Sequence, residues 1–137
     1  MTTATLTING TRYPLNQATV RRDTDPPRAS LDCQIVGPHA FMIGDAVLFE
    51  VSGAAAMAGL IETATPDARM TRISAELTAA SGVGAWPPGP VQYRSTGLLR
   101  VDLNFDIHPG HTWQGSRIKS LTHTIGAGAP WFSELRF

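Results

Sequence analysis

The chain has 137 residues, 42% of them hydrophobic and 16% charged, so it is long enough for one domain with a buried core. Eleven Lys and Arg residues balance eleven Asp and Glu residues. The resulting net charge of zero provides no basic field for nucleic acid or an anionic membrane, and no long-range repulsion between copies of the chain. We therefore expect no nucleic-acid specificity and a protein that associates with itself.

Simple sequence features disfavour a disulfide-stabilised protein, a secreted protein with a signal peptide and a membrane protein. The lone cysteine, Cys33, cannot close an intramolecular disulfide. Residues 1–5 show no basic region followed by an apolar stretch, so we expect no signal peptide. The longest apolar run is far short of the roughly 20 residues that a membrane helix needs, so we also expect no membrane insertion.

Alternation of polar and apolar residues begins at the N-terminus. Residues 3–8 (TATLTI) place Ala4, Leu6 and Ile8 on one face, which predicts a strand. The Asn9-Gly10 pair that follows predicts a tight hairpin, because both residue types tolerate positive φ. Further short strands are predicted, in chain order, at residues 30–36 (SLDCQIV), 46–51 (AVLFEV), 59–63 (GLIET), 72–77 (RISAEL) and 131–137 (WFSELRF).

The clearest predicted strand covers residues 98–108 (LLRVDLNFDIH). Its apolar face would carry Leu99, Val101, Leu103, Phe105 and Ile107. Helical signals are weak, since the Ala-rich residues 53–59 are bracketed by glycines and too short for a stable helix. The sequence therefore predicts an all-β fold, a small barrel or split barrel of antiparallel strands with long loops, and no helix longer than about three turns.

Residues 82–90 (GVGAWPPGP) interrupt this pattern, because clustered glycines and prolines cannot continue a sheet. We expect either a surface loop within a single domain, residues 1–137, or a connector between two β sub-parts, residues 1–81 and 91–137. A second interpretation makes the segment a stiff arm that presents Trp86, with Pro87 and Pro88, to a partner.

Histidines raise the question of a metal site. His108 and His111 flank a Pro-Gly pair, and His123 could approach them across a hairpin, with Asp106 as a fourth ligand. However, the Pro-Gly turn does not require the first two imidazoles to point the same way. His123 also shares its predicted strand face with apolar residues, where an imidazole is usually hydrogen-bonded. We therefore predict a turn that binds no metal.

Catalytic arrangements find little support. The chain has no Gly-x-Ser-x-Gly elbow and no phosphate-binding glycine motif, and Cys33 lies on an apolar strand face, where thiols are inert. Asp102 and Asp106 share the outer face of one predicted strand, a common solvated pattern that still leaves a glycosidase pair open. We predict no catalytic residue, no cofactor and no enzymatic activity.

Two stretches together resemble the hub-type β-barrel domains of phage tail proteins. In residues 98–137 a strand leads into a Pro-Gly turn, then a glycine-led strand, the pattern LTHTI, a short glycine loop and a final strand opening on an aromatic residue. Residues 44–64 are similar to the first strands of such a barrel, with Gly44-Asp45 entering one strand and Gly59 entering its partner. The order of these elements carries the resemblance more than any single motif.

This resemblance implies a structural component of a phage or phage-like tail, made in the host cytoplasm and located in the virion. The short chain matches a minor tail or tail-tip (baseplate hub) protein that forms or joins a ring with other copies and other tail proteins. The predicted interface residues are Trp86, Pro87, Pro88, Trp113, Trp131 and Phe137. Two alternatives remain: a carbohydrate-binding β-module, in which Trp86, Trp113 and Trp131 would form one platform, and a small cell-wall hydrolase.

Overall fold

The computed structural model describes residues 3–24, 27–51, 55–78, 84–85, 91–126 and 131–137. Within these ranges every regular element is a β-strand, which confirms the all-β prediction. No helix long and apolar enough to cross a membrane is found among them. The Ala-rich stretch considered for a short helix lies partly in a strand that begins at Ala55.

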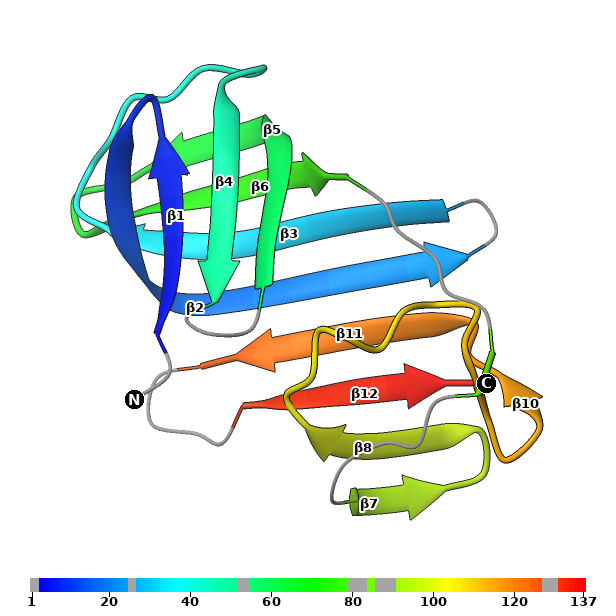
Figure 1. The fold of residues 1–137 in the computed structure, drawn as a ribbon. Helices are drawn as coiled ribbons and strands as arrows, with labels where there is room; N and C mark the ends of the chain where they lie inside the picture. Colours follow the sequence, from blue (N-terminus) through cyan, green and yellow to red (C-terminus); the bar gives the residue numbers. More distant parts are fainter. Residues whose placement is uncertain (1–2, 25–26, 52–54, 79–83, 86–90, 127–130) are drawn as a thin grey trace.

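The described residues form twelve strands, whose arrangement is drawn in Figure 1. They are β1 (Ala4–Ile8), β2 (Thr11–Thr24), β3 (Pro27–Val36), β4 (Ala46–Val51), β5 (Ala55–Pro66), β6 (Met70–Leu77), β7 (Val91–Ser95), β8 (Leu98–Asp102), β9 (Thr112–Trp113), β10 (Ser116–Arg117), β11 (Ser120–Ile125) and β12 (Phe132–Arg136). Strands β9 and β10 form a separate two-stranded ribbon, and the other ten form one sheet.

Six antiparallel strands close into a barrel in the order β1-β4-β5-β6-β3-β2, because β2 pairs back with β1. The predicted hairpin between β1 and β2 is present, with φ of 51° at Asn9 and 84° at Gly10.

The barrel also depends on close packing at Gly59 of β5. A Cβ at that position would stand 2.2 Å from the carbonyl oxygen of Glu76 on β6, so only glycine fits there without a shift of the backbone.

The remaining strands continue the sheet away from the barrel. The long strand β2 pairs with β1 through residues 11–14 and with β11 through residues 18–23. From β11 the sheet runs on through β12 and β8 to β7, which we call the extension together with β9, β10 and their loops. Figure 1 shows the barrel at the top of the view and β7 at the bottom. One strand therefore belongs to both parts and fixes where the extension begins.

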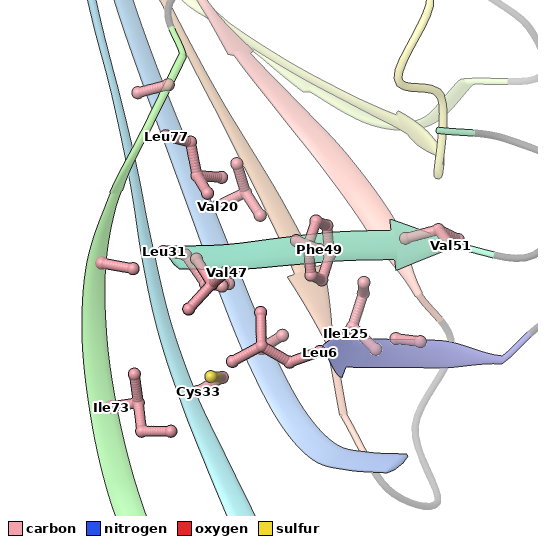
Figure 2. Close-up of a cluster of buried hydrophobic side chains, with 14 of the residues drawn as sticks. Leu6, Val20, Leu31, Cys33, Val47, Phe49, Val51, Ile73, Leu77 and Ile125 are labelled. Carbon is pink, nitrogen blue, oxygen red and sulfur yellow. The ribbon is translucent and has the colours of Figure 1, made fainter. Parts of the chain in front are cut away.

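Two groups of buried apolar side chains hold these parts together. The barrel core lies inside the six strands, and Figure 2 shows Leu6, Phe49 and Ile125 converging there. Ile125 comes from β11, so the extension contributes to the barrel core. The extension core is smaller and consists of Leu99, Val101, Ile107, Ile118, Leu121 and Leu135.

The prediction of one strand over residues 98–108 is wrong in its second half, because β8 ends at Asp102. Its neighbour β12 supplies its last partner there, Phe132, and the chain then turns out of the sheet. The Asn104 side chain accepts a hydrogen bond from the backbone N–H of Asp106 at 2.9 Å, which stabilises a local turn in place of a strand. The apolar residues of this stretch are still buried: Phe105 packs in the barrel core and Ile107 in the extension core.

Candidate functional site

Two of the three histidines considered as metal ligands meet at Arg22, a buried residue of β2. Arg22 Nη1 lies 3.4 Å from Nε2 of His123, and Arg22 Nη2 donates to Nδ1 of His108. The backbone N–H of His108 in turn donates to Nδ1 of His111 at 3.0 Å, across the predicted Pro-Gly turn. The histidines therefore converge, although the Pro-Gly turn did not require it, and Arg22 contacts both His108 and His123.

Arg22 has only 2% of its surface exposed, and no described carboxylate lies within ion-pair distance of it. Instead, Nη1 donates to the carbonyl oxygens of Ile107 at 2.8 Å and Phe105 at 3.4 Å. Burial lowers the pKa of Arg22 to about 10, so the group stays charged at neutral pH. A buried cation is tolerated here because backbone dipoles and imidazole nitrogens take the place of water.

His123 lies on β11 with no exposed surface. Its Nδ1 lies 2.7 Å from Oγ of Ser133, which itself accepts the backbone N–H of Asn104. Its ring stacks on Phe105 with 4.1 Å between centroids. Burial, followed by the charges of Arg22 and His108, lowers the pKa of His123 to about 3, so this imidazole is neutral at physiological pH.

The Arg22–histidine cluster, comprising Arg22, His108, His123 and Ser133, fastens the segment after β8 onto β2 and β11. Each of these side chains hydrogen-bonds to another protein group, and none of the described pockets includes Arg22 or His123. In the described part of the chain, no three His, Cys, Asp or Glu side chains are grouped so that they could hold a metal ion. The geometry favours a structural connection between barrel and extension.

The sequence carries a signal for this cluster that a search for histidine ligands alone does not reveal. Along β2, Ala18, Val20, Arg22 and Thr24 alternate on the buried face. An arginine at a core-facing position implies buried partners elsewhere in the chain, because an isolated buried charge is costly. Alternation could have identified Arg22, although not its partners, which lie more than eighty residues away.

The lone cysteine behaves as predicted for an apolar strand face. Cys33 is buried in the barrel core, and burial together with the charge of Asp32 raises its pKa to about 12. The thiol is therefore protonated at neutral pH and unsuited to act as a nucleophile.

Trp113 and Phe137, two of the predicted interface residues, lie together at the end of the extension. Their rings are 5.9 Å apart, both are half-buried, and the guanidinium of Arg94 lies 5.0 Å from the Trp113 ring. The three residues line a pocket of about 640 Å³ beside the turn between β7 and β8. This pocket is open to solvent and has two aromatic side chains in its lining.

The other predicted interface residues are placed differently. Trp131 is half-buried, packs against the barrel core and donates from Nε1 to the carbonyl oxygen of Gly126 at 3.0 Å. Trp86, Pro87 and Pro88 lie outside the described residues. Because Trp113 and Trp131 pack against different cores, they do not belong to one flat aromatic platform.

Strand β7 is the open end of the ten-stranded sheet. It pairs with β8 on one side, and in the described part of the chain no strand pairs with its other side. All five of its residues are exposed, and Val91 and Tyr93 expose 49% and 51% of their surface. An exposed strand edge with apolar side chains is a ready template for pairing with another strand.

Apolar side chains are also exposed on the outside of the barrel. Leu48 of β4 and Leu60 of β5 point outward, and Met42 and Ile43 lie in the preceding loop with more than 70% of their surface exposed. The Met42 carbonyl accepts the N–H of Asp45, which places this turn at the start of β4. The barrel therefore presents a second apolar surface, separate from β7.

Comparisons with known proteins place these observations in context. No family model matches the chain, and no curated protein matches it. Among solved structures, a tail protein of Neisseria meningitidis MC58 is similar over 56% of this chain and 24% of its own, with a TM-score of 0.47 and 16% identity. The 43 kDa tail protein of prophage MuSo2 from Shewanella oneidensis is similar over 56% of this chain and 28% of its own, with a TM-score of 0.41 and 15% identity. The matched region therefore spans about a quarter of the length of the tail proteins to which the chain is similar.

Proposed function

We propose that this protein is a structural component of a phage or phage-like tail, a minor tail or tail-tip hub-type protein that forms or joins a ring in the virion. It acts through its shape and its contacts, without catalysis and without a cofactor. Its partners are further copies of the chain and other tail proteins.

The observation that carries the assembly part of this proposal is the open end of the sheet. Closure pairs most strand edges of the barrel, whereas the extension leads the sheet outward and ends at β7 with every residue exposed. A monomer gains nothing from such an edge, and proteins that stay monomeric usually protect it with charges, prolines or a covering loop. Pairing with a neighbour satisfies the free backbone groups of β7.

Support for a tail protein in particular comes from the sequence resemblance. Residues 98–137 form β8 to β12, and residues 44–64 form β4 and most of β5. The two stretches that carry the resemblance therefore supply parts of one continuous sheet. We further propose a single domain whose sub-parts, residues 1–81 and 91–137, correspond to the barrel and the extension.

The geometry supports neither of the two alternatives, the carbohydrate-binding module and the small cell-wall hydrolase. The carbohydrate-binding interpretation needs a common platform for Trp113 and Trp131, and these residues pack against different cores. For the hydrolase, Asp102 accepts a hydrogen bond from Gln92 at 2.6 Å and Asp106 belongs to an exposed turn. A structural role, by contrast, accounts for the unpaired edge of β7 and for the exposed apolar side chains of the barrel.

Immunogold labelling tests the proposal. Antibodies against the chain are applied to particles released by the organism that encodes it, and tails are imaged by negative-stain electron microscopy. We expect gold at one fixed position on the tail. Label found only on free protein, with intact unlabelled tails, would contradict the proposed function. Deletion of the coding sequence serves as the control and should remove the label together with normal tails.

A further inference from the structure

The sheet has a second free edge, in the barrel. Strand β5 is longer than β4, and the last β4 partner is Ala46, which pairs with Leu60. Ile61 still bonds to the turn before β4, through the N–H of Gly44 and the carbonyl of Asp45. Beyond it, Glu62 lies at an irregularity of the β5–β6 register, residues 63–66 pair with β6, and the described residues provide no strand on the other side of this segment.

This half of β5 is accessible. Glu62, Thr63, Thr65 and Pro66 are exposed, and Ala64 is half-buried against the barrel core. The described chain thus leaves residues 62–66 unpaired on one side, as it leaves β7, and residues 55–57 at the other end of β5 also pair with β4 only. Figure 1 shows β5 in the barrel and β7 at the far end of the extension, so the two segments lie in opposite parts of the molecule.

Charge differs between the two parts, although the chain as a whole is neutral. Residues 1–78 contain six Lys and Arg residues and eight Asp and Glu residues, a net charge of −2. Residues 91–137 contain five Lys and Arg residues and three Asp and Glu residues, a net charge of +2. Within the two segments themselves, Arg94 is the one charged residue of β7 and Glu62 is the one charged residue of residues 62–66, although Arg72 of β6 pairs with Thr65 beside the second segment.

We propose that copies of this chain associate head to tail, with β7 of one copy pairing antiparallel to residues 62–66 of the next. This inference deepens the proposed function and rests on it for its biological setting. Placing Arg94 opposite Glu62 also aligns Tyr93 with Thr63 and Val91 with Thr65. Each contact then pairs both free edges and brings opposite charges together.

Charge also decides between this arrangement and the simpler one in which two copies pair through β7 alone. A two-fold contact of that kind brings two parts of charge +2 together, with Arg94 and Arg100 of both copies near the interface, which disfavours it. It would also leave residues 62–66 unpaired. A head-to-tail contact uses different surfaces on each copy and therefore produces a closed ring or an open filament.

Disulfide cross-linking distinguishes the two arrangements. Cross-strand neighbours have Cα atoms about 5.5 Å apart, which is within reach of a disulfide. We expect Val91→Cys and Thr65→Cys to give heterodimers when the two variants are mixed, and a ladder of multimers when both are in one chain. Wild-type protein is the control, because its own cysteine is buried. Dimers of the Val91→Cys variant alone, or no cross-link in any sample, would overturn the proposal.

Charge reversal provides a second measurement that does not depend on cysteine chemistry. Arg94→Glu or Glu62→Arg should each weaken association by about tenfold in sedimentation velocity at low salt, and the double reversal should restore it. Arg136→Glu is the matched control: it changes the charge of the extension equally but lies on β12, away from β7. Equal effects of Arg94→Glu and Arg136→Glu, or no restoration in the double variant, would contradict the pairing.

The outcomes separate this inference from the proposed function. Labelled tails without cross-links would leave the structural role intact and overturn the head-to-tail contact. Cross-links and a ladder, with unlabelled tails, would establish the contact and overturn the assignment to a tail.

Discussion

In the barrel, alternate residues of each strand are apolar and meet in a core that is almost free of charge. The extension adds Phe105 and Ile125 to that core but also meets the barrel through buried arginine, histidine and serine. The barrel is held by non-directional apolar burial, which tolerates small shifts. The Arg22–histidine cluster is directional, since its groups must face one another to be satisfied. The difference implies that this cluster adds directional constraints to the β2–β11 pairing and the apolar contacts that join barrel and extension.

The largest effect is expected from loss of the Arg22 guanidinium or protonation of the imidazole beside it. Replacing Arg22 by Met removes the donors to the carbonyls of Ile107 and Phe105 and leaves Nε2 of His123 without its buried partner. We expect the free energy of unfolding to fall by about 3 kcal/mol or more, as when one member of a buried polar network is removed. Urea denaturation measures this loss.

Arg21→Met is the matched control, because Arg21 is the neighbouring residue on β2 and is exposed. The control should change stability by no more than about 0.5 kcal/mol. Equal losses in both variants would show that the cluster does not fasten the extension.

Acid should weaken the same connection. The pKa of His123 is about 3 in the folded protein, against about 6.5 when the chain is unfolded, so the unfolded state binds more protons below pH 6.5. The free energy of unfolding therefore falls as pH decreases from 6.5 towards 3, by on the order of 4 kcal/mol from this group. Urea denaturation at a series of pH values gives the slope.

His123→Asn should flatten that slope, and His39→Asn, outside the cluster, is the matched control. The pKa of His108 is also lowered, by burial, then by Arg22 and His111, while Asp106 opposes the shift, so His108 adds to the loss in the same direction. A slope in the His123→Asn variant equal to that of the wild type would contradict this account.

A smaller effect is expected where β5 and β6 approach closely in the barrel. Gly59→Ala would place a Cβ against the backbone of Glu76, and the strands would have to move apart, which should cost about 1–3 kcal/mol. Gly126→Ala is the control, because a Cβ there meets nothing within 4 Å. Thermal unfolding of both variants would show whether barrel closure depends on this contact.

The smallest effect on folding is expected at Trp86. If the stiff segment around it contacts a neighbour, Trp86→Ala should leave the melting temperature of the monomer nearly unchanged and weaken assembly by about 2 kcal/mol per contact. Trp131→Ala is the comparison, because Trp131 packs against the barrel core and its loss should lower the melting temperature. A lower melting temperature for Trp86→Ala, with unchanged assembly, would identify Trp86 as a core residue.

The sequence predicted the barrel more completely than the extension, for a physical reason. Alternation at Ala4, Leu6 and Ile8, and the positive φ available to Asn9-Gly10, are local properties, and the structure confirms both. The strand predicted over residues 98–108 failed because its second half obeys alternation while its backbone groups hydrogen-bond to side chains. The carbonyls of Phe105 and Ile107 accept from Arg22, and no local pattern reveals so distant a donor.

The candidate surfaces were predicted only in part. Trp113 and Phe137 do lie together beside a surface pocket, but the free half of β5 follows from a mismatch in strand length between β4 and β5. Such a mismatch depends on register, which the sequence does not show. The net charges of the two parts can be counted from the sequence. Their relevance to association follows only from the positions of β7 and residues 62–66 in the fold.

Negative-stain electron microscopy of the purified protein, over a range of concentrations at low salt, tests the head-to-tail association most directly. We expect closed rings or short curved filaments at high concentration, and single particles when Arg94→Glu is introduced. Two-fold dimers, or wild-type particles that remain monomeric at every concentration, would contradict the account.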